Sequence, residues 1–175
     1  VYISSGEVYG EQLNNALGFE ETCNSIVEPL KLRNCYPIGK IASENLCVAY
    51  FKQYGIKTYI ARLSHTYGPT ISPTNSRADA QFLRNAIDHQ DIVLKSAGEQ
   101  VRSYCYVEDA CIGLLYILIK GEPGEAYNVT DTKSVVSIRK YAEILASLAG
   151  VKIVFDNPSY AESVGFTKIQ KGILD

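Results

Sequence analysis

The fold follows from residues 37–63, PIGKIASENLCVAYFKQYGIKTYIARL, which divide into a helical and a strand-forming part. Apolar residues recur at helical spacing, a proline suits the first turn and Gly55 suits the stop, so we expect a helix over Pro37–Tyr54. The run Lys57–Leu63 predicts a strand, and the β-rich run Val1–Ser4 predicts another. The order strand, helix, strand indicates parallel strands joined by a helical crossover, hence an α/β sheet.

The rest of the chain continues to alternate between helices and strands. The expected helices are Arg77–His89, Glu108–Lys120 and a segment from the N-cap Ser137 to Ala149; the expected strands are Ile92–Leu94, Val101–Val107, Ala126–Val129 and Val151–Phe155. We expect His65–Pro69 to be a loop. The apolar run Cys111–Ile119 is far shorter than the ~20 residues of a membrane span, so we expect it to lie in a buried helix.

The composition excludes several classes of protein. A net charge of −2 with scattered Lys and Arg leaves no electrostatic footprint for nucleic acid, and no apolar run is long enough to predict a membrane protein. Five cysteines without paired short spacings indicate neither a disulfide framework nor a zinc site, so we expect no metal and a cytoplasmic location. Because the sequence has no basic stripe, an anionic ligand must be bound by individual side chains.

Tyr36 and Lys40 form a Y-x-x-x-K pattern at the start of the first expected helix. This spacing places an ammonium beside a phenol, which favours the phenolate and makes it a usable base for a sugar hydroxyl. The pattern alone carries little weight, because Tyr116 and Lys120 repeat it in an apolar helix where we expect the tyrosine to be packed. Tyr36 differs because the polar segment 4–10 ends a strand, where open α/β sheets bind ligands.

Five segments, in this order, resemble the extended short-chain dehydrogenase/reductases that act on nucleotide sugars. SSGEVYG at 4–10 is similar to the family's S/T-x-x-V-Y-G segment, YPIGK at 36–40 to its Tyr-Lys helix start, ARLSHTYGP at 61–69 to its R-x-x-N-x-[YF]-G-P loop, VRSYCYVEDA at 101–110 to its R-[DSA]-[YFW]-x-[YH]-V-x-D segment, and YNV at 127–129 to its Y-N-V/I strand. The resemblance covers residues 1–150. It implies an α/β fold with a partial Rossmann-type parallel sheet and a smaller substrate-binding region.

The resemblance also implies a division of the chain. Residues 1–70 correspond to the C-terminal half of an NAD-binding Rossmann domain with the catalytic residues, and residues 71–175 mainly to the sugar-nucleotide-binding region, with interleaved boundaries. No G-x-x-G-x-x-G loop occurs in the 175 residues, although the family's first half supplies one. We therefore expect an N-terminally truncated chain that is inactive alone. We also expect the full-length protein to be a homodimer.

The catalytic roles come from the same resemblance. Ser5 corresponds to the Ser or Thr that hydrogen-bonds the reacting hydroxyl, with a turn or cap serine as the alternative. Tyr36 corresponds to the general base, and Lys40 to the lysine that tunes it and holds the nicotinamide ribose; the alternative is a surface pair. Ser64 joins Tyr36 and Lys40 as a cofactor-binding residue.

The resemblance also concerns residues that contact the substrate and residues that act in the reaction step after C4 oxidation. Glu7 matches the glutamate of dehydratase and decarboxylase members, or is a solvated loop residue, but Gly6 stands where a 4,6-dehydratase has its general-acid aspartate. Arg102 corresponds to an arginine that contacts the substrate diphosphate, or is an exposed strand arginine. His65 replaces a substrate-contacting asparagine, or is a satisfied loop histidine, whereas Arg62 is expected to be structural.

The implied function is that of an NAD-dependent epimerase or dehydratase acting on a nucleotide-diphosphate sugar. C4 oxidation to a 4-keto sugar comes first, and the presence of Glu7 favours a dehydratase-type second step. The alternatives are a UDP-sugar 4-epimerase, a decarboxylase, or a truncated, non-catalytic module that only binds a nucleotide sugar.

Overall fold

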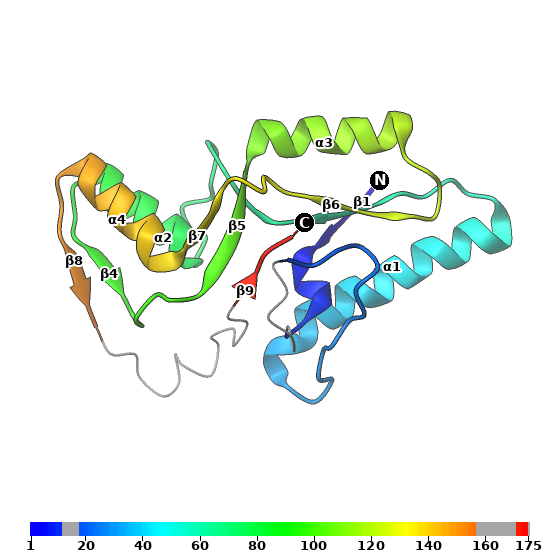
Figure 1. Ribbon diagram of the computed structural model, residues 1–175, viewed down its shortest axis with the longest axis horizontal. Helices are drawn as coiled ribbons and strands as arrows, with labels where there is room; N and C mark the ends of the chain where they lie inside the picture. Colours follow the sequence, from blue (N-terminus) through cyan, green and yellow to red (C-terminus); the bar gives the residue numbers. More distant parts are fainter. Residues whose placement is uncertain (12–17, 157–170, 175) are drawn as a thin grey trace.

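The computed structural model describes residues 1–11, 18–156 and 171–174 (Figure 1). Its first sheet has three parallel strands. Its strands lie in the order β1 (Tyr2–Ser5), β2 (Ile60–Leu63) and β6 (Ala126–Val129). Helix α1 (Cys35–Tyr54) lies on one side of this sheet and α3 (Val107–Lys120) on the other (Figure 1). The parallel strand-helix-strand arrangement expected from residues 37–63 is confirmed.

A second sheet continues from the end of the first. It has the order β3 (His65–Tyr67), β5 (Val101–Tyr106) and β7 (Val135–Ser137), and β9 (Lys171–Gly172) also pairs with β5. The expectation of a loop at His65–Pro69 is wrong for its first three residues, because their backbone pairs in parallel with residues 104–106 of β5.

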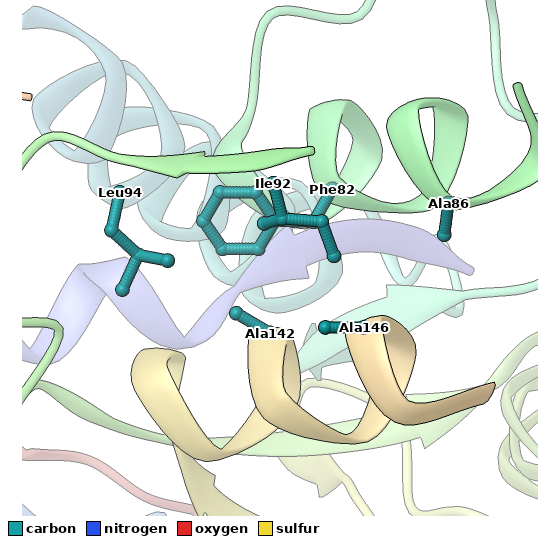
Figure 2. Close-up of a cluster of buried hydrophobic side chains, with 6 residues drawn as sticks. All are labelled: Phe82, Ala86, Ile92, Leu94, Ala142 and Ala146. Carbon is teal, nitrogen blue, oxygen red and sulfur yellow. The ribbon is translucent and has the colours of Figure 1, made fainter. Parts of the chain in front are cut away.

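The remaining elements form a smaller layer with its own core. Helices α2 (Ala78–Ile87) and α4 (Ile138–Ala149) pack beside the parallel pair β4 (Ile92–Leu94) and β8 (Ile153–Phe155). Figure 2 shows the buried side chains between these elements, which are Phe82, Ala86, Ile92, Leu94, Ala142 and Ala146. Ser137 caps α4, as expected, by accepting a hydrogen bond from the Lys140 amide at 3.0 Å.

Helix α3 differs from the buried helix expected for the apolar run Cys111–Ile119. Ala110 and Ile117 pack against residues of β2, β5 and β6, but the opposite side of the helix is exposed. Its exposed large hydrophobic residues are Ile112, Leu115, Tyr116, Leu118 and Ile119. Only one face meets the sheet, so the expectation that Tyr116 is packed is also wrong: its exposed fraction is 66%.

The register of the first sheet decides which polar residues meet. Ser5 pairs with Leu63 at the carboxyl ends of β1 and β2. The chain then enters a 3-10 helix, η1 (Gly6–Tyr9), after β1, and reaches Ser64 and His65 after β2. Both sets of residues therefore lie at the same edge of the sheet, where open α/β sheets bind their ligands.

Candidate active site

A cavity of about 390 Å³ opens at this edge of the sheet. Its wall includes the expected site residues Ser5, Glu7, Ser64, His65 and Arg102. The start of α2, the end of β4 and the C-terminal residues Gly172 and Leu174 complete it. The cavity thus lies between the parallel sheet and the smaller α2–α4 layer.

Ser5 is positioned by the turn that follows β1. Its Oγ accepts a hydrogen bond from the Glu7 amide at 3.2 Å, so it caps η1, and no described residue accepts its proton. The next position, Gly6, is packed closely: a Cβ built there would lie 2.9 Å from Cδ2 of Leu174. An aspartate at position 6 would therefore require Leu174 to move.

Glu7 is held by an arginine that the sequence patterns did not single out. Arg33, in the short 3-10 helix η2 (Leu32–Asn34), donates from Nη1 to Glu7 Oε2 at 2.7 Å and from Nη2 to Oε1 at 3.0 Å. This bidentate bond raises the pKa of Arg33. The side chains are only 24% and 29% exposed for Glu7 and Arg33 respectively, so Glu7 is not the solvated loop residue of the alternative interpretation.

Tyr36 and Lys40 lie beside β1, although neither is among the residues that line the cavity. Lys40 Nζ donates to the Ile3 carbonyl at 2.8 Å and lies 5.7 Å from the centroid of the Tyr36 ring. Arg33, before Tyr36, contacts Glu7, and Lys40, after it, contacts Ile3, so the start of α1 runs antiparallel alongside the end of β1. Tyr36 lies between these two anchoring residues along the chain. The exposed fraction of Tyr36 is 42%, which leaves it accessible to a substrate.

Ser64 and His65 follow β2 into the cavity wall. Ser64 Oγ is buried and has no hydrogen-bond partner among the described residues. The His65 ring lies 5.6 Å from that of Tyr104. Burial, followed by the charge of Arg102, lowers the pKa of His65 to about 4. His65 is therefore a neutral imidazole near pH 7.

Arg102 is a buried cation. It is 3% exposed, lies in β5, and donates from Nη1 to the Val101 carbonyl at 2.8 Å. Burial lowers its pKa, and the nearby Tyr104 and Glu7 partly offset that effect, but a guanidinium stays protonated in proteins. The alternative of an exposed strand arginine does not hold.

Arg62 has the structural role expected for it. Its guanidinium bonds the buried carboxylate of Glu44 on α1, with an Nη2 to Oε2 distance of 2.8 Å, and also donates to Tyr9 Oη at 2.9 Å. Ser4 Oγ donates to the same carboxylate. These bonds fix α1 against β1 and β2, and thereby the helix that carries Tyr36.

Residues 1–11, 18–156 and 171–174 contain neither a candidate metal site nor a candidate membrane span. Among these residues, no group of three His, Cys, Asp or Glu side chains is placed to hold a metal ion. No helix in the same ranges has the length and apolar character needed to cross a membrane.

Comparisons with known proteins identify the family. Residues 1–130 match the model of the NAD dependent epimerase/dehydratase family. UDP-glucuronic acid decarboxylase 3 of Arabidopsis thaliana is 34% identical over 121 residues, which are 69% of this chain and 35% of that protein. The dTDP-D-glucose 4,6-dehydratase of Dictyostelium discoideum is 29% identical over 136 residues, 74% of this chain and 30% of that protein.

A solved structure shows the same fold. The crystal structure of DesIV, a dTDP-glucose 4,6-dehydratase from Streptomyces venezuelae with NAD and TYD bound, is 25% identical, with a TM-score of 0.78 over 99% of this chain and 50% of that one. The chain thus spans about a third of these curated relatives and half of that structure. The likeness confirms the α/β fold with a partial Rossmann-type sheet. The chain belongs to the NAD-dependent epimerase/dehydratase family.

Proposed function

We propose that the protein carrying this chain oxidises a nucleotide-diphosphate sugar at C4, with NAD as cofactor and Tyr36 as the base. The observation that carries the proposal is the pair of contacts on either side of Tyr36. Arg33 to Glu7 and Lys40 to Ile3 hold the start of α1 against the end of β1, and this anchoring supports a site in which the Tyr36 phenol acts with the Ser5 hydroxyl.

The residues present fit the nicotinamide end of the cofactor. Ser64 Oγ is a buried polar atom without a partner among the described residues, and a buried polar group of this kind needs a hydrogen bond. Lys40 and Tyr36 would hold the ribose beside it. NAD, when bound, supplies the hydride acceptor for the oxidation of C4.

Each side chain then has a defined task. Tyr36 takes the proton of the C4 hydroxyl, with the Lys40 ammonium 5.7 Å from the centroid of its ring. Ser5 accepts from the Glu7 amide and keeps its own proton to donate to the C4 oxygen. Arg102 supplies a buried positive charge for the diphosphate.

For the second step, the structure favours decarboxylation over the dehydratase-type reaction that the sequence favoured. Loss of water across C5 and C6 needs an acid for the leaving hydroxyl, yet Gly6 has no side chain and Leu174 packs against it. Loss of carbon dioxide needs no such acid. With a keto group at C4, the C5–C6 bond of a uronate breaks, its electron pair moves to the C4 oxygen as an enolate, and C5 then takes up a proton. The hydride removed from C4 in the first step would then return to C4, the C4 oxygen would regain its proton, and the product would be a pentose nucleotide.

Glu7 is the acid–base group that we assign to the proton at C5, because it projects from the same wall as Ser5. Removing a positioned general base or acid typically costs ~10²–10⁴-fold in rate. In the Glu7→Gln variant, oxidation by Tyr36 survives and the second step slows. Reduced cofactor and the 4-keto sugar should then accumulate.

The experiment uses the complete protein with NAD and, in parallel, UDP-glucuronate, UDP-glucose and dTDP-glucose. We expect carbon dioxide and a pentose nucleotide from UDP-glucuronate, no product with Tyr36→Phe, and a rise in NADH absorbance with Glu7→Gln. A 4-keto-6-deoxy product from dTDP-glucose would instead identify a dehydratase, and a C4 epimer with unchanged Glu7→Gln turnover an epimerase. Binding of all three sugars without any reduced cofactor would identify a non-catalytic module.

A further inference from the structure

Three charged side chains lie in the same cavity wall, and one of them belongs to no motif of the chain. Glu7, Arg33 and Arg102 all line the cavity. Arg33 binds both oxygens of Glu7, at 2.7 and 3.0 Å. Burial lowers the pKa of Arg102, and the negative charge of Glu7 partly opposes this effect. The direct bonds to the Glu7 carboxylate come from Arg33.

The described part of the cavity wall contains charged side chains of both signs. The cations are Arg33, Arg77, Lys95 and Arg102, and the carboxylates are Glu7 and Asp79. His65 adds no charge near pH 7, since burial lowers its pKa to about 4. Within this wall Arg33 is the cation bonded directly to Glu7, so the local charge beside Ser5 depends on Arg33.

Without Arg33, Glu7 would present an uncompensated carboxylate to the sugar. A second carboxylate, on C5 of a uronate, would then be repelled, and this repulsion is strong because a partly buried site screens charge less than water does. A neutral hydroxymethyl group at the same place would experience no such repulsion. The Arg33–Glu7 bond therefore bears on the choice between an acidic and a neutral sugar.

We propose that Arg33 is the specificity-determining residue that admits a sugar carboxylate beside Glu7. It acts through Glu7, by neutralising that carboxylate and fixing its orientation with a two-point bond. The inference rests on the proposed function, because it concerns the same nucleotide-sugar site, and it names the substrate class of that site as nucleotide uronates.

The charges give predictions of opposite sign for the two partners. Arg33→Gln should weaken binding of UDP-glucuronate relative to UDP-glucose by roughly tenfold or more, a factor exceeded when one partner of a buried charge pair is removed. Glu7→Gln should shift the same ratio in favour of UDP-glucuronate, because Arg33 is then unpaired. The double variant, which removes both charges, should return the ratio to near that of the unsubstituted protein.

Calorimetry on the complete protein with the reduced cofactor NADH, which cannot accept a hydride from C4, measures both dissociation constants without turnover. Arg139→Gln is the matched control, since it breaks an exposed Arg–Glu pair at 3.1 Å whose two residues are not among those that line the cavity, and it should leave the ratio unchanged. Arg33→Lys keeps the charge and should keep most of the preference. If Arg33→Gln does not fold, Arg33→Lys and Glu7→Gln still decide.

The outcomes separate this inference from the proposed function. If the unsubstituted protein binds neither nucleotide sugar, the proposed function fails. If it binds both and the ratio is the same in Arg33→Gln, or does not rise in Glu7→Gln, the role of Arg33 is overturned. A double variant that behaves like Arg33→Gln alone would also overturn it, because Arg33 would then not act through Glu7.

Discussion

Acidification should destabilise this protein through His65, the histidine in the cavity wall. The ordinary pKa of a histidine is 6.5, and burial, aided by the charge of Arg102, lowers that of His65 to about 4. Between these two pKa values, the His65 imidazole is protonated in the unfolded chain and neutral in the folded chain. The stability that the neutral His65 contributes is therefore fully present above pH 6.5 and is lost as the pH falls toward about 4.

The size of this effect follows from the difference between the two pKa values. A drop from 6.5 to about 4 is roughly 2.5 units, and each unit corresponds to about 1.4 kcal/mol, so the loss is at most about 3 kcal/mol. Whole domains are stable by only ~5–15 kcal/mol. His65 alone should therefore make a visible contribution to acid sensitivity.

The assay compares urea unfolding of the unsubstituted protein and His65→Asn at neutral and at mildly acidic pH. Carboxylates titrate equally in both, so the difference between the two proteins isolates His65. The chain has two histidines, so the imidazole NMR signal that the variant loses belongs to His65. Equal pH dependence in the two proteins, or a His65 signal that titrates at the ordinary value, would refute the reasoning.

Three further predictions concern α1 and its anchoring. Tyr36→Phe should abolish turnover with little change in nucleotide-sugar affinity, because only the proton acceptor is lost, whereas Tyr116→Phe should leave kinetics unchanged; retained kcat in the first variant contradicts the assignment. Lys40→Ala should weaken NAD binding in calorimetry, because the cofactor ribose loses a charged hydrogen-bond donor; unchanged NAD affinity speaks against this role. Arg62→Gln should lower the free energy of unfolding by about 3–5 kcal/mol, as expected when a buried ion pair loses one partner, against less than about 1 kcal/mol for the exposed Arg139→Gln; equal urea midpoints would show that the buried pair contributes nothing special.

Several parts of the site could be predicted from sequence because they depend on local spacing. The four-residue interval between Tyr36 and Lys40 sets both on one side of a helix. Short apolar runs predicted strand ends at Ser4 and Leu63, and the structure has them at Ser5 and Leu63. The same interval at Tyr116 and Lys120 shows the limit of this reasoning. Spacing says nothing about what a helix face contacts, and Tyr116 turned out to be exposed.

The sequence by itself determined the alternation of helices and strands, the parallel crossover, and the family to which the chain belongs. Each of these is carried by periodicity, caps or ordered motifs that lie close together along the chain. The tertiary structure alone decided that Arg33 neutralises Glu7, although 26 residues separate them, and that Leu174 packs against Gly6. It also decided that His65 pairs with β5 instead of lying in a loop. Such contacts join residues that are far apart in sequence, so no local pattern encodes them, and only the packing of the sheets brings them together.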